Sequence, residues 1–207
     1  MARPREYDDD LRVRLIEAAA RVLAEEGPAA MTTRRIAAEV GTSTTAIYSL
    51  IGSKDDLLAA IAHEGFRRLA EHLARVTPSD DPLADLGAMG LAYHDMAIES
   101  PELYAVMFSR AHLAIVDETE AAFSLATLQT LIDAVQRAID AGELTGDAND
   151  VALRMWGLNH GITSLAIAGM MGTPADARRR VREAGLDLLA GLRREPEAHA
   201  VSRRAAR

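Results

Sequence analysis

The chain has 207 residues, no cysteine, few aromatic side chains (4%) and a formal net charge of −8. The lack of cysteine excludes disulfides, thiolate metal sites and a cysteine nucleophile, and the acidic balance argues against a protein that coats nucleic acid through phosphate attraction. The charge is unevenly distributed. Residues 1–54 contain eight basic and eight acidic side chains, so the whole negative excess lies in the rest of the chain. This distribution suits a chain that touches a polyanion only locally.

Apolar residues recur at helical spacing along the whole chain, and no segment alternates as a strand would. The first helix is predicted to end at Gly27, which can take a left-handed cap, and Gly41 separates two short helices. Thr32 or Thr33 is the expected N-cap of the first short helix, and Thr42 or Ser43 that of the second. The predicted helices cover residues 9–26, 33–40, 43–50, 54–76, 83–99, 101–113, 118–141, 148–170 and 175–194.

The two short helices around Gly41 have the pattern of a helix-turn-helix. Ile36, Ala37 and Ile47 fall where two crossed helices need a shared core, and this architecture presents the second helix to the major groove of DNA. The outward positions of that helix carry hydroxyl groups and one phenol, which suit phosphate oxygens and base edges. These outward residues are Thr42, Ser43, Thr44, Thr45, Tyr48 and Ser49.

Residues 32–58, TTRRIAAEVGTSTTAIYSLIGSKDDLL, resemble the DNA-binding signature of the TetR repressor family. The resemblance implies that Tyr48 and Lys54 hold phosphates and that Thr44 and Thr45 read bases. The chain departs from the family pattern at Leu50 and Ile51, where a His and a Phe are more common and the His is often a phosphate contact. The predicted DNA-binding residues are Thr33, Arg34, Arg35, Thr42, Ser43, Thr44, Thr45, Tyr48 and Lys54.

The helix predicted over residues 148–170 is apolar nearly all round and carries a stripe of small residues that would let a second helix pack closely. Residues 155–175 include no charged side chain, but their polar groups favour a covered helix over a membrane span. We expect a homodimer formed by this helix and the last one. The predicted dimer residues are Gly157, Gly161, Ser164, Ala168, Val181, Ala184 and Leu188. Trp156 and His160-Gly161 also resemble a Trp-His-Gly signature of one C-terminal subtype of the family.

Methionine and aromatic residues in the central helices are candidates for a pocket that binds a small apolar effector, because such walls adapt to varied ligands. Ordinary core packing is the alternative for each of them. The candidates are Leu86, Met89, Tyr93, Met96, Met107, Phe108, Leu128, Trp156 and Asn159.

We therefore expect an all-α protein: a three-helix DNA-binding domain over residues 1–53, joined by a long helix to an effector-binding and dimerisation domain over residues 54–195, and a disordered tail over residues 196–207. The expected function is a repressor that a small molecule releases from a palindromic operator in double-stranded DNA. The N-terminus lacks the apolar core of a secretion signal, so the expected location is the cytoplasm, without membrane contact.

Two other classes of protein compete with this interpretation. An enzyme is not expected, because the sequence has no phosphate-binding glycine loop, no nucleophile elbow and no zinc helix, and we predict neither a metal nor a cofactor. The second class is a helical interaction protein with a degenerate DNA-binding head, which the departures at Leu50 and Ile51 suggest.

Overall fold

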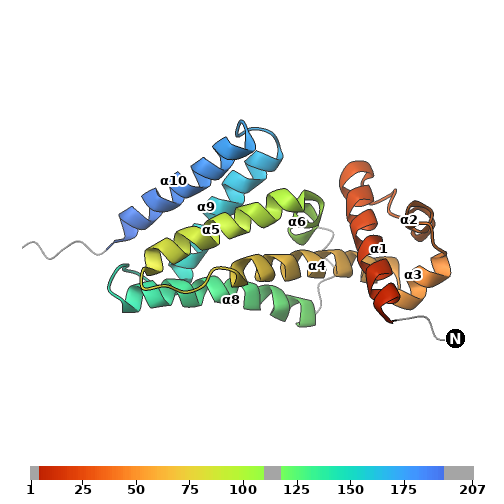
Figure 1. Cartoon of the computed structure of the whole chain (residues 1–207), viewed down its shortest axis with the longest axis horizontal. Helices are drawn as coiled ribbons and strands as arrows, with labels where there is room; N and C mark the ends of the chain where they lie inside the picture. Colours follow the sequence, from red (N-terminus) through yellow and green to blue (C-terminus); the bar gives the residue numbers. More distant parts are fainter. Residues whose placement is uncertain (1–4, 110–117, 194–207) are drawn as a thin grey trace, which may run out of the picture. The chain divides into compact units, whose positions relative to one another are not determined.

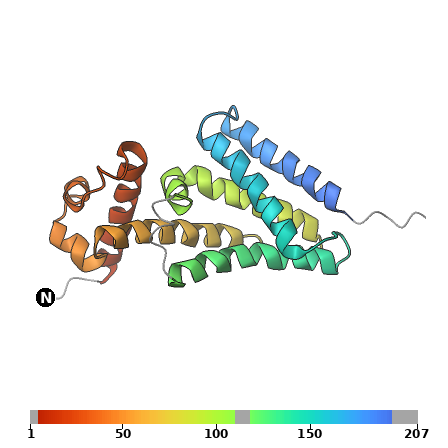
Figure 2. The ribbon, with the colours of Figure 1, turned by 180° about the vertical axis from the view of Figure 1, so that it is seen from behind.

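The computed structural model describes residues 5–109 and 118–193, and it contains no β-strand within these ranges. The predicted all-α fold is confirmed. The predicted tail over residues 196–207 lies outside the described residues. The helices (Figures 1 and 2) are α1 (Arg5–Glu26), α2 (Thr33–Val40), α3 (Thr44–Leu50), α4 (Lys54–Ala74), α5 (Pro82–Glu99), α6 (Pro101–Met107), α8 (Glu118–Asp140), α9 (Ala148–Ile167) and α10 (Pro174–Leu192).

Some helix ends differ from the sequence-based expectation, at positions where the sequence signal for a helix boundary is weak. Helix α1 begins at Arg5 instead of Asp9, since none of the residues between them prevents a helix. Helix α9 ends at Ile167 instead of near residue 170, because Gly169 adopts a left-handed conformation with φ +74°. Within the described ranges, no helix has the length and apolarity needed to cross a bilayer.

The chain forms two compact units, which are described separately. Unit 1 comprises residues 1–75 and 92–128, and unit 2 comprises residues 76–91 and 129–207. Helices α5 and α8 each contribute residues to both units. The domain border predicted after residue 53 lies inside unit 1.

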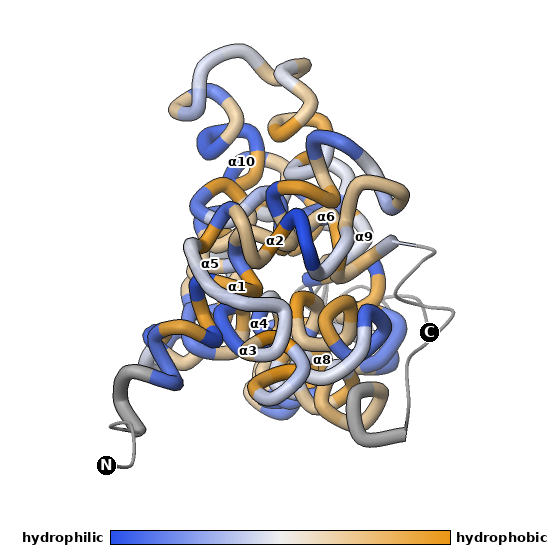
Figure 3. The backbone as a smooth tube through the Cα atoms, turned by 90° about the vertical axis from the view of Figure 1, so that its right-hand side faces the viewer, coloured by the Kyte–Doolittle hydropathy of each residue, from blue (hydrophilic) through white to orange (hydrophobic). Residues whose placement is uncertain are grey.

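The core of unit 1 is shared by five helices. Leu15 of α1, Ile36 of α2, Ile47 of α3 and Ile61 of α4 are fully buried in one hydrophobic cluster, which Leu103 of α6 joins. In Figure 3, hydrophobic and hydrophilic stretches alternate along α1, as expected for a helix with one buried face. The three N-terminal helices therefore do not form a separate core.

In unit 2, helices α9 and α10 lie side by side (Figure 2). Val151 of α9 and Leu189 of α10 are buried. An ion pair between Arg137 of α8 and the buried Asp85 of α5 adds a polar tie between these two helices.

The capping box at the start of α10 predicts how the stability of this helix start depends on pH. The Thr173 hydroxyl accepts a hydrogen bond from the Asp176 backbone N–H at 3.2 Å, and the Asp176 carboxylate accepts one from the Thr173 N–H at 3.1 Å. Hydrogen bonds from the Thr173 side chain and backbone lower the pKa of Asp176 from 3.8 to about 2.

Because the pKa is lower in the folded state, the Asp176 carboxylate stabilises the folded helix start above pH 3.8, and this contribution is lost as the pH falls towards 2. We expect Asp176→Asn to speed amide hydrogen exchange in the first turn of α10 at pH 5, with a much smaller effect near pH 2. Asp187→Asn, an exposed position in the same helix, is the control. An equal effect of Asp176→Asn at both pH values would contradict a role for the ionised carboxylate.

Candidate nucleic-acid interface

The turn between α2 and α3 is fixed by local hydrogen bonds. Thr32 is the N-cap of α2, and its hydroxyl accepts from the Arg35 N–H at 3.2 Å. Gly41 ends α2 in the left-handed region with φ +74°, where a side chain is strained. Ser43 is the N-cap of α3, with its hydroxyl accepting from the Ala46 N–H at 3.2 Å. These caps hold both short helices at defined positions around the turn.

Helix α3 has one polar face that is open to solvent. Ile47 is fully buried and attaches the helix to the core of unit 1, whereas Thr45, Tyr48 and Ser49 are exposed. These three positions are spaced i, i+3 and i+4 and therefore lie on one side of the helix. Tyr48 has 59% of its surface exposed, which is high for a large aromatic side chain. Ser43 is also exposed, and Thr33, Thr42 and Thr44 are half-buried.

The three basic candidates beside this face differ in whether their charge is engaged. Arg35 pairs with Glu26 at 3.0 Å and with Glu39 at 3.1 Å. The Lys54 ammonium donates to the Pro28 carbonyl at 2.7 Å. Arg34 is exposed and has no ion pair or side-chain hydrogen bond to any described residue. Arg34 is therefore the candidate whose guanidinium is available for a phosphate.

Two further arginines, which no sequence pattern singled out, position α2 against α1. Arg14 donates to the Val40 carbonyl at 2.9 Å, at the end of α2, and Arg21 pairs with Glu39 at 2.8 Å. Their partners are 26 and 18 residues away in the sequence, so no spacing pattern could reveal the contacts.

Leu50 and Ile51 are half-buried and pack against the hydrophobic cluster of unit 1. These two departures from the family pattern thus lie at packing positions, and the exposed polar face of α3 does not depend on them. Among the described residues, no observation favours a degenerate DNA-binding head.

Five of the predicted effector residues lie in unit 1, and several belong to an aromatic cluster. Tyr93 donates a hydrogen bond to the Tyr104 hydroxyl at 3.2 Å. Tyr104 packs edge-to-face on Phe108 with ring centroids 5.2 Å apart, and Phe66 does so at 6.0 Å. Tyr104 and Phe66 were not among the predicted residues. Met96 and Met107 are buried, and Leu128 is half-buried.

The other four candidates lie in unit 2, where Leu86 and Asn159 line a small cavity of about 20 Å³ among α5, α9 and α10. Asn159 is 9% exposed, and its amide makes no hydrogen bond to any described residue. A space of this size holds one water molecule. Met89 is buried and Trp156 half-buried, and neither lines the cavity.

Exposed apolar side chains concentrate in the last two helices and the loop between them. Of the nine large hydrophobic residues exposed in the described ranges, five lie between residues 153 and 186, namely Leu153, Leu165, Ile167, Met170 and Leu186. We call these five residues the exposed apolar group. Among the predicted dimer residues, Gly157, Gly161 and Ala168 are exposed and Ser164, Ala184 and Leu188 are half-buried. Val181 is 2% exposed, so its own chain covers it.

Comparison with known proteins identifies both parts of the chain. Residues 15–61 match the family described as bacterial regulatory proteins, tetR family. Residues 86–189, half of the chain, match the tetracyclin repressor-like C-terminal domain. The Trp-His-Gly subtype stays a prediction.

Among relatives, the HTH-type transcriptional regulator Mb1846 of Mycobacterium bovis is 26% identical over 154 residues, which cover 72% of this chain and 65% of the relative. The chain thus spans slightly less than two thirds of the length of this relative. A protein of unknown function from Rhodococcus sp. RHA1 has 29% identity and a TM-score of 0.76, over 89% of this chain and 96% of that one.

The TetR family transcriptional regulator PfmR of Thermus thermophilus shares the fold, with a TM-score of 0.72 at 19% identity over 87% of this chain and all of that one. The helix-turn-helix around Gly41 and most of the region from α5 to α10 thus fall within matched ranges. The chain belongs to the TetR family of bacterial regulatory proteins.

Proposed function

We propose that this chain is a transcriptional repressor that binds a palindromic operator as a homodimer and leaves it when a small apolar molecule binds. The observation that carries the proposal is the exposed polar face of α3, with Tyr48 59% exposed at its centre and Ile47 buried behind it. A solvent-exposed phenol between hydroxyl groups suits contact with phosphates and base edges better than it suits a surface that contacts only water.

The charge around this face supports DNA as the partner. Arg34 has no partner among the described residues and can bind a phosphate. Four other cations of the DNA-binding head, residues 1–54, are engaged by carboxylates or carbonyl groups, namely Arg14, Arg21, Arg35 and Lys54. A small number of unengaged cations gives weak non-specific attraction, so affinity must come from correctly placed contacts at a specific site.

A homodimer is supported by the exposed apolar group of α9, α10 and the loop between them. Gly157 and Gly161 add to this support, because a Cβ placed on either glycine would meet no described atom within 4 Å. Such open, small-residue positions let a second copy approach closely. Two heads in one dimer would contact half-sites about one DNA turn, roughly 34–36 Å, apart.

The effector is proposed to be apolar because six of the nine candidate residues are methionines or aromatic residues, and four of these six are buried. The amide of Asn159, which makes no hydrogen bond to a described residue, offers one polar group to a bound molecule or water. Binding that favours another head separation would shift the dimer away from DNA. The comparisons indicate a regulator instead of an enzyme, and its proposed place of action is the cytoplasm, where the chromosome lies.

The first test is titration of the protein against a labelled fragment of its own upstream DNA at two salt concentrations. We expect sequence-specific binding that weakens with salt. Arg34→Ala should reduce the slope of log K against log salt by about 1 for each phosphate that is no longer bound. Tyr48→Ala should lower affinity about tenfold at either salt concentration, as removal of one hydrogen-bonding group does.

Arg180→Ala is the matched control, because Arg180 is also exposed and has no ion pair to a described residue, but it belongs to α10. We expect this variant to bind as the wild type does. Absence of specific binding by the wild-type protein would refute the proposed function, and equal effects of the Arg34 and Arg180 substitutions would refute the assigned face.

A further inference from the structure

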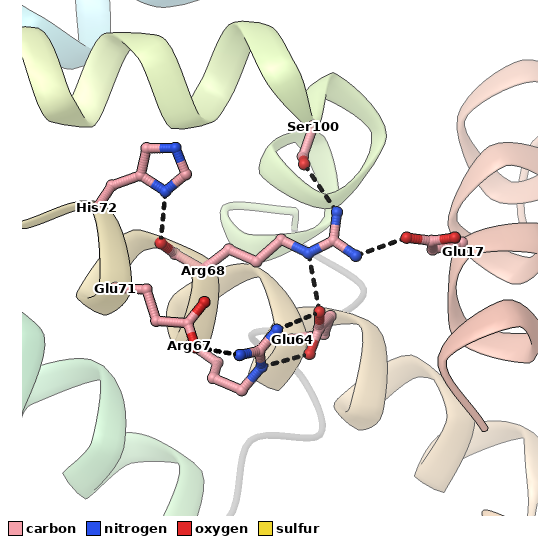
Figure 4. Close-up of polar contacts among 7 residues, drawn as sticks. All are labelled: Glu17, Glu64, Arg67, Arg68, Glu71, His72 and Ser100. Atoms are coloured by element: carbon pink, nitrogen blue, oxygen red, sulfur yellow. Dashed lines mark hydrogen bonds and ion pairs between the residues drawn. The ribbon is translucent and has the colours of Figure 1, made fainter. Parts of the chain in front are cut away.

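Arg68 of α4 joins three helical elements through one guanidinium group (Figure 4). Its Nη2 donates to the Glu17 carboxylate of α1 at 2.6 Å, and its Nη1 donates to the Ser100 hydroxyl at 3.0 Å. Its Nε donates to Glu64 of its own helix at 2.8 Å. All four residues belong to unit 1. A single side chain thereby connects the head helix α1 to the corner where α5 ends and α6 begins.

Ser100 occupies that corner, directly between Glu99 of α5 and Pro101 of α6. It is 7% exposed and is the N-cap residue of α6, yet its side chain makes no cap hydrogen bond. Its hydroxyl instead accepts from Arg68. His72 of α4 also reaches the corner, with its Nε2 3.1 Å from the Glu99 carboxylate. The corner is therefore held to α4 by polar contacts from two successive turns.

Neutralisation of Glu64 does not require Arg68. Glu64 is 5% exposed and accepts two hydrogen bonds from Arg67, at 2.7 and 2.8 Å. Burial acts to raise the pKa of Glu64, but the contacts with Arg67 and Arg68 outweigh it, so the pKa lies below its usual value. If Arg68 is removed, Arg67 still pairs with the buried carboxylate. The contacts of Arg68 with Glu17 and Ser100 are what Arg67 cannot replace.

We propose that Arg68 is a positioning residue that transmits a displacement of the α5–α6 corner to α1, and so sets the orientation of the DNA-binding head. Helix α5 begins among residues of unit 2 and ends beside Ser100 in unit 1. A ligand that shifts α5 would therefore move the Ser100 hydroxyl, and the guanidinium would pull on Glu17. The regulatory meaning of this inference rests on the proposed repressor function, whereas the mechanical link does not.

The test measures amide hydrogen exchange of α1 without DNA or effector. Ser100→Ala is expected to raise exchange around Glu17 about threefold in the wild-type background, as coupled sites in one network do. The same substitution in an Arg68→Met background should leave α1 exchange unchanged, because the link is already broken. In an Arg67→Met background, the matched control, the threefold effect should persist, since the ion pairs of Arg67 stay within α4.

The Arg68→Lys variant tests whether the response of α1 depends on the shape of the arginine side chain or only on its positive charge. Lysine keeps the positive charge but lacks the planar fork that reaches several partners. We expect Arg68→Lys to unfold at the same denaturant concentration as the wild type and yet to lose the response of α1 to Ser100→Ala. Because one ammonium group cannot reproduce the fork, a full threefold response in the Arg68→Lys protein would overturn the proposal.

An effect of Ser100→Ala that is confined to α6, or that is equal with and without Arg68, would also overturn the proposal. These outcomes are distinct from failure of the proposed function, which would appear as absence of operator binding by the wild-type protein while the exchange results stand. Where operator binding is present, Arg68→Met is expected to weaken the operator affinity about threefold, which matches the expected rise in amide hydrogen exchange of α1.

Discussion

A glutamate in place of Leu153 or Leu186 is expected to convert the proposed homodimer into monomers and to lower operator affinity about a hundredfold. Leu153 is 48% exposed on α9 and Leu186 is 59% exposed on α10. Within a dimer both side chains would be buried, and a buried carboxylate without a partner is strongly unfavourable. A monomer would bind one half-site at a time and lose the gain from two linked heads.

Sedimentation equilibrium measures the first effect and operator titration the second. Leu125→Glu is the matched control, because Leu125 is 63% exposed on α8 and the chemical change is the same. We expect the control protein to sediment as a dimer and to bind DNA normally. A dimeric Leu153→Glu, Leu186→Glu double variant would show that α9 and α10 do not form the interface.

The sequence was sufficient to predict the turn between α2 and α3, because its determinants are local. Thr32, Gly41 and Ser43 each act within four residues of their own position. Helix α9 was predicted to be covered by the core on one side and by a second subunit on the other, and its Leu153, Leu165 and Ile167 side chains are exposed in the single chain.

Contacts between residues distant in the sequence were not predictable. Arg34 and Arg35 are neighbours in one helix turn, and the pair of Arg35 with Glu39 has the i,i+4 spacing that a sequence can suggest. The pair of Arg35 with Glu26 of α1 appears only in the fold, which leaves Arg34 without a described partner. Arg68 is an ordinary charged residue in the sequence, yet it contacts Glu17, 51 residues away, and Ser100, 32 residues away. Such long-range pairs require the packing of several helices before they can form.

Burial could be predicted only in part. Val181 was assigned to the dimer interface because of its position in the pattern of α10, but its own chain covers it. The two sides of an apolar helix are equivalent in the sequence, and the fold decides which one faces the core. For the effector candidates, the sequence could identify apolar walls but not their division between the two compact units.

The head and α6 share one hydrophobic cluster, so a defect in α1 should weaken both. Leu15 of α1 is fully buried in this cluster. We expect Leu15→Ala to reduce the free energy of unfolding of unit 1 by about 2–5 kcal/mol, because apolar packing is removed and a cavity remains. Amide hydrogen exchange in α1, α2 and α6 during denaturation measures this change, and the single tryptophan, Trp156, reports unit 2 by fluorescence.

The matched control for this substitution is Leu125→Ala, which makes the same chemical change at a position 63% exposed. We expect it to change stability by less than about 0.5 kcal/mol, as is usual for surface positions. If Leu15→Ala cost no more than Leu125→Ala, α1 would not be part of a shared core. If exchange rose in α1 and α2 but not in α6, the head would be an independent domain, and a contact such as that of Arg68 with Glu17 would have no core through which to act.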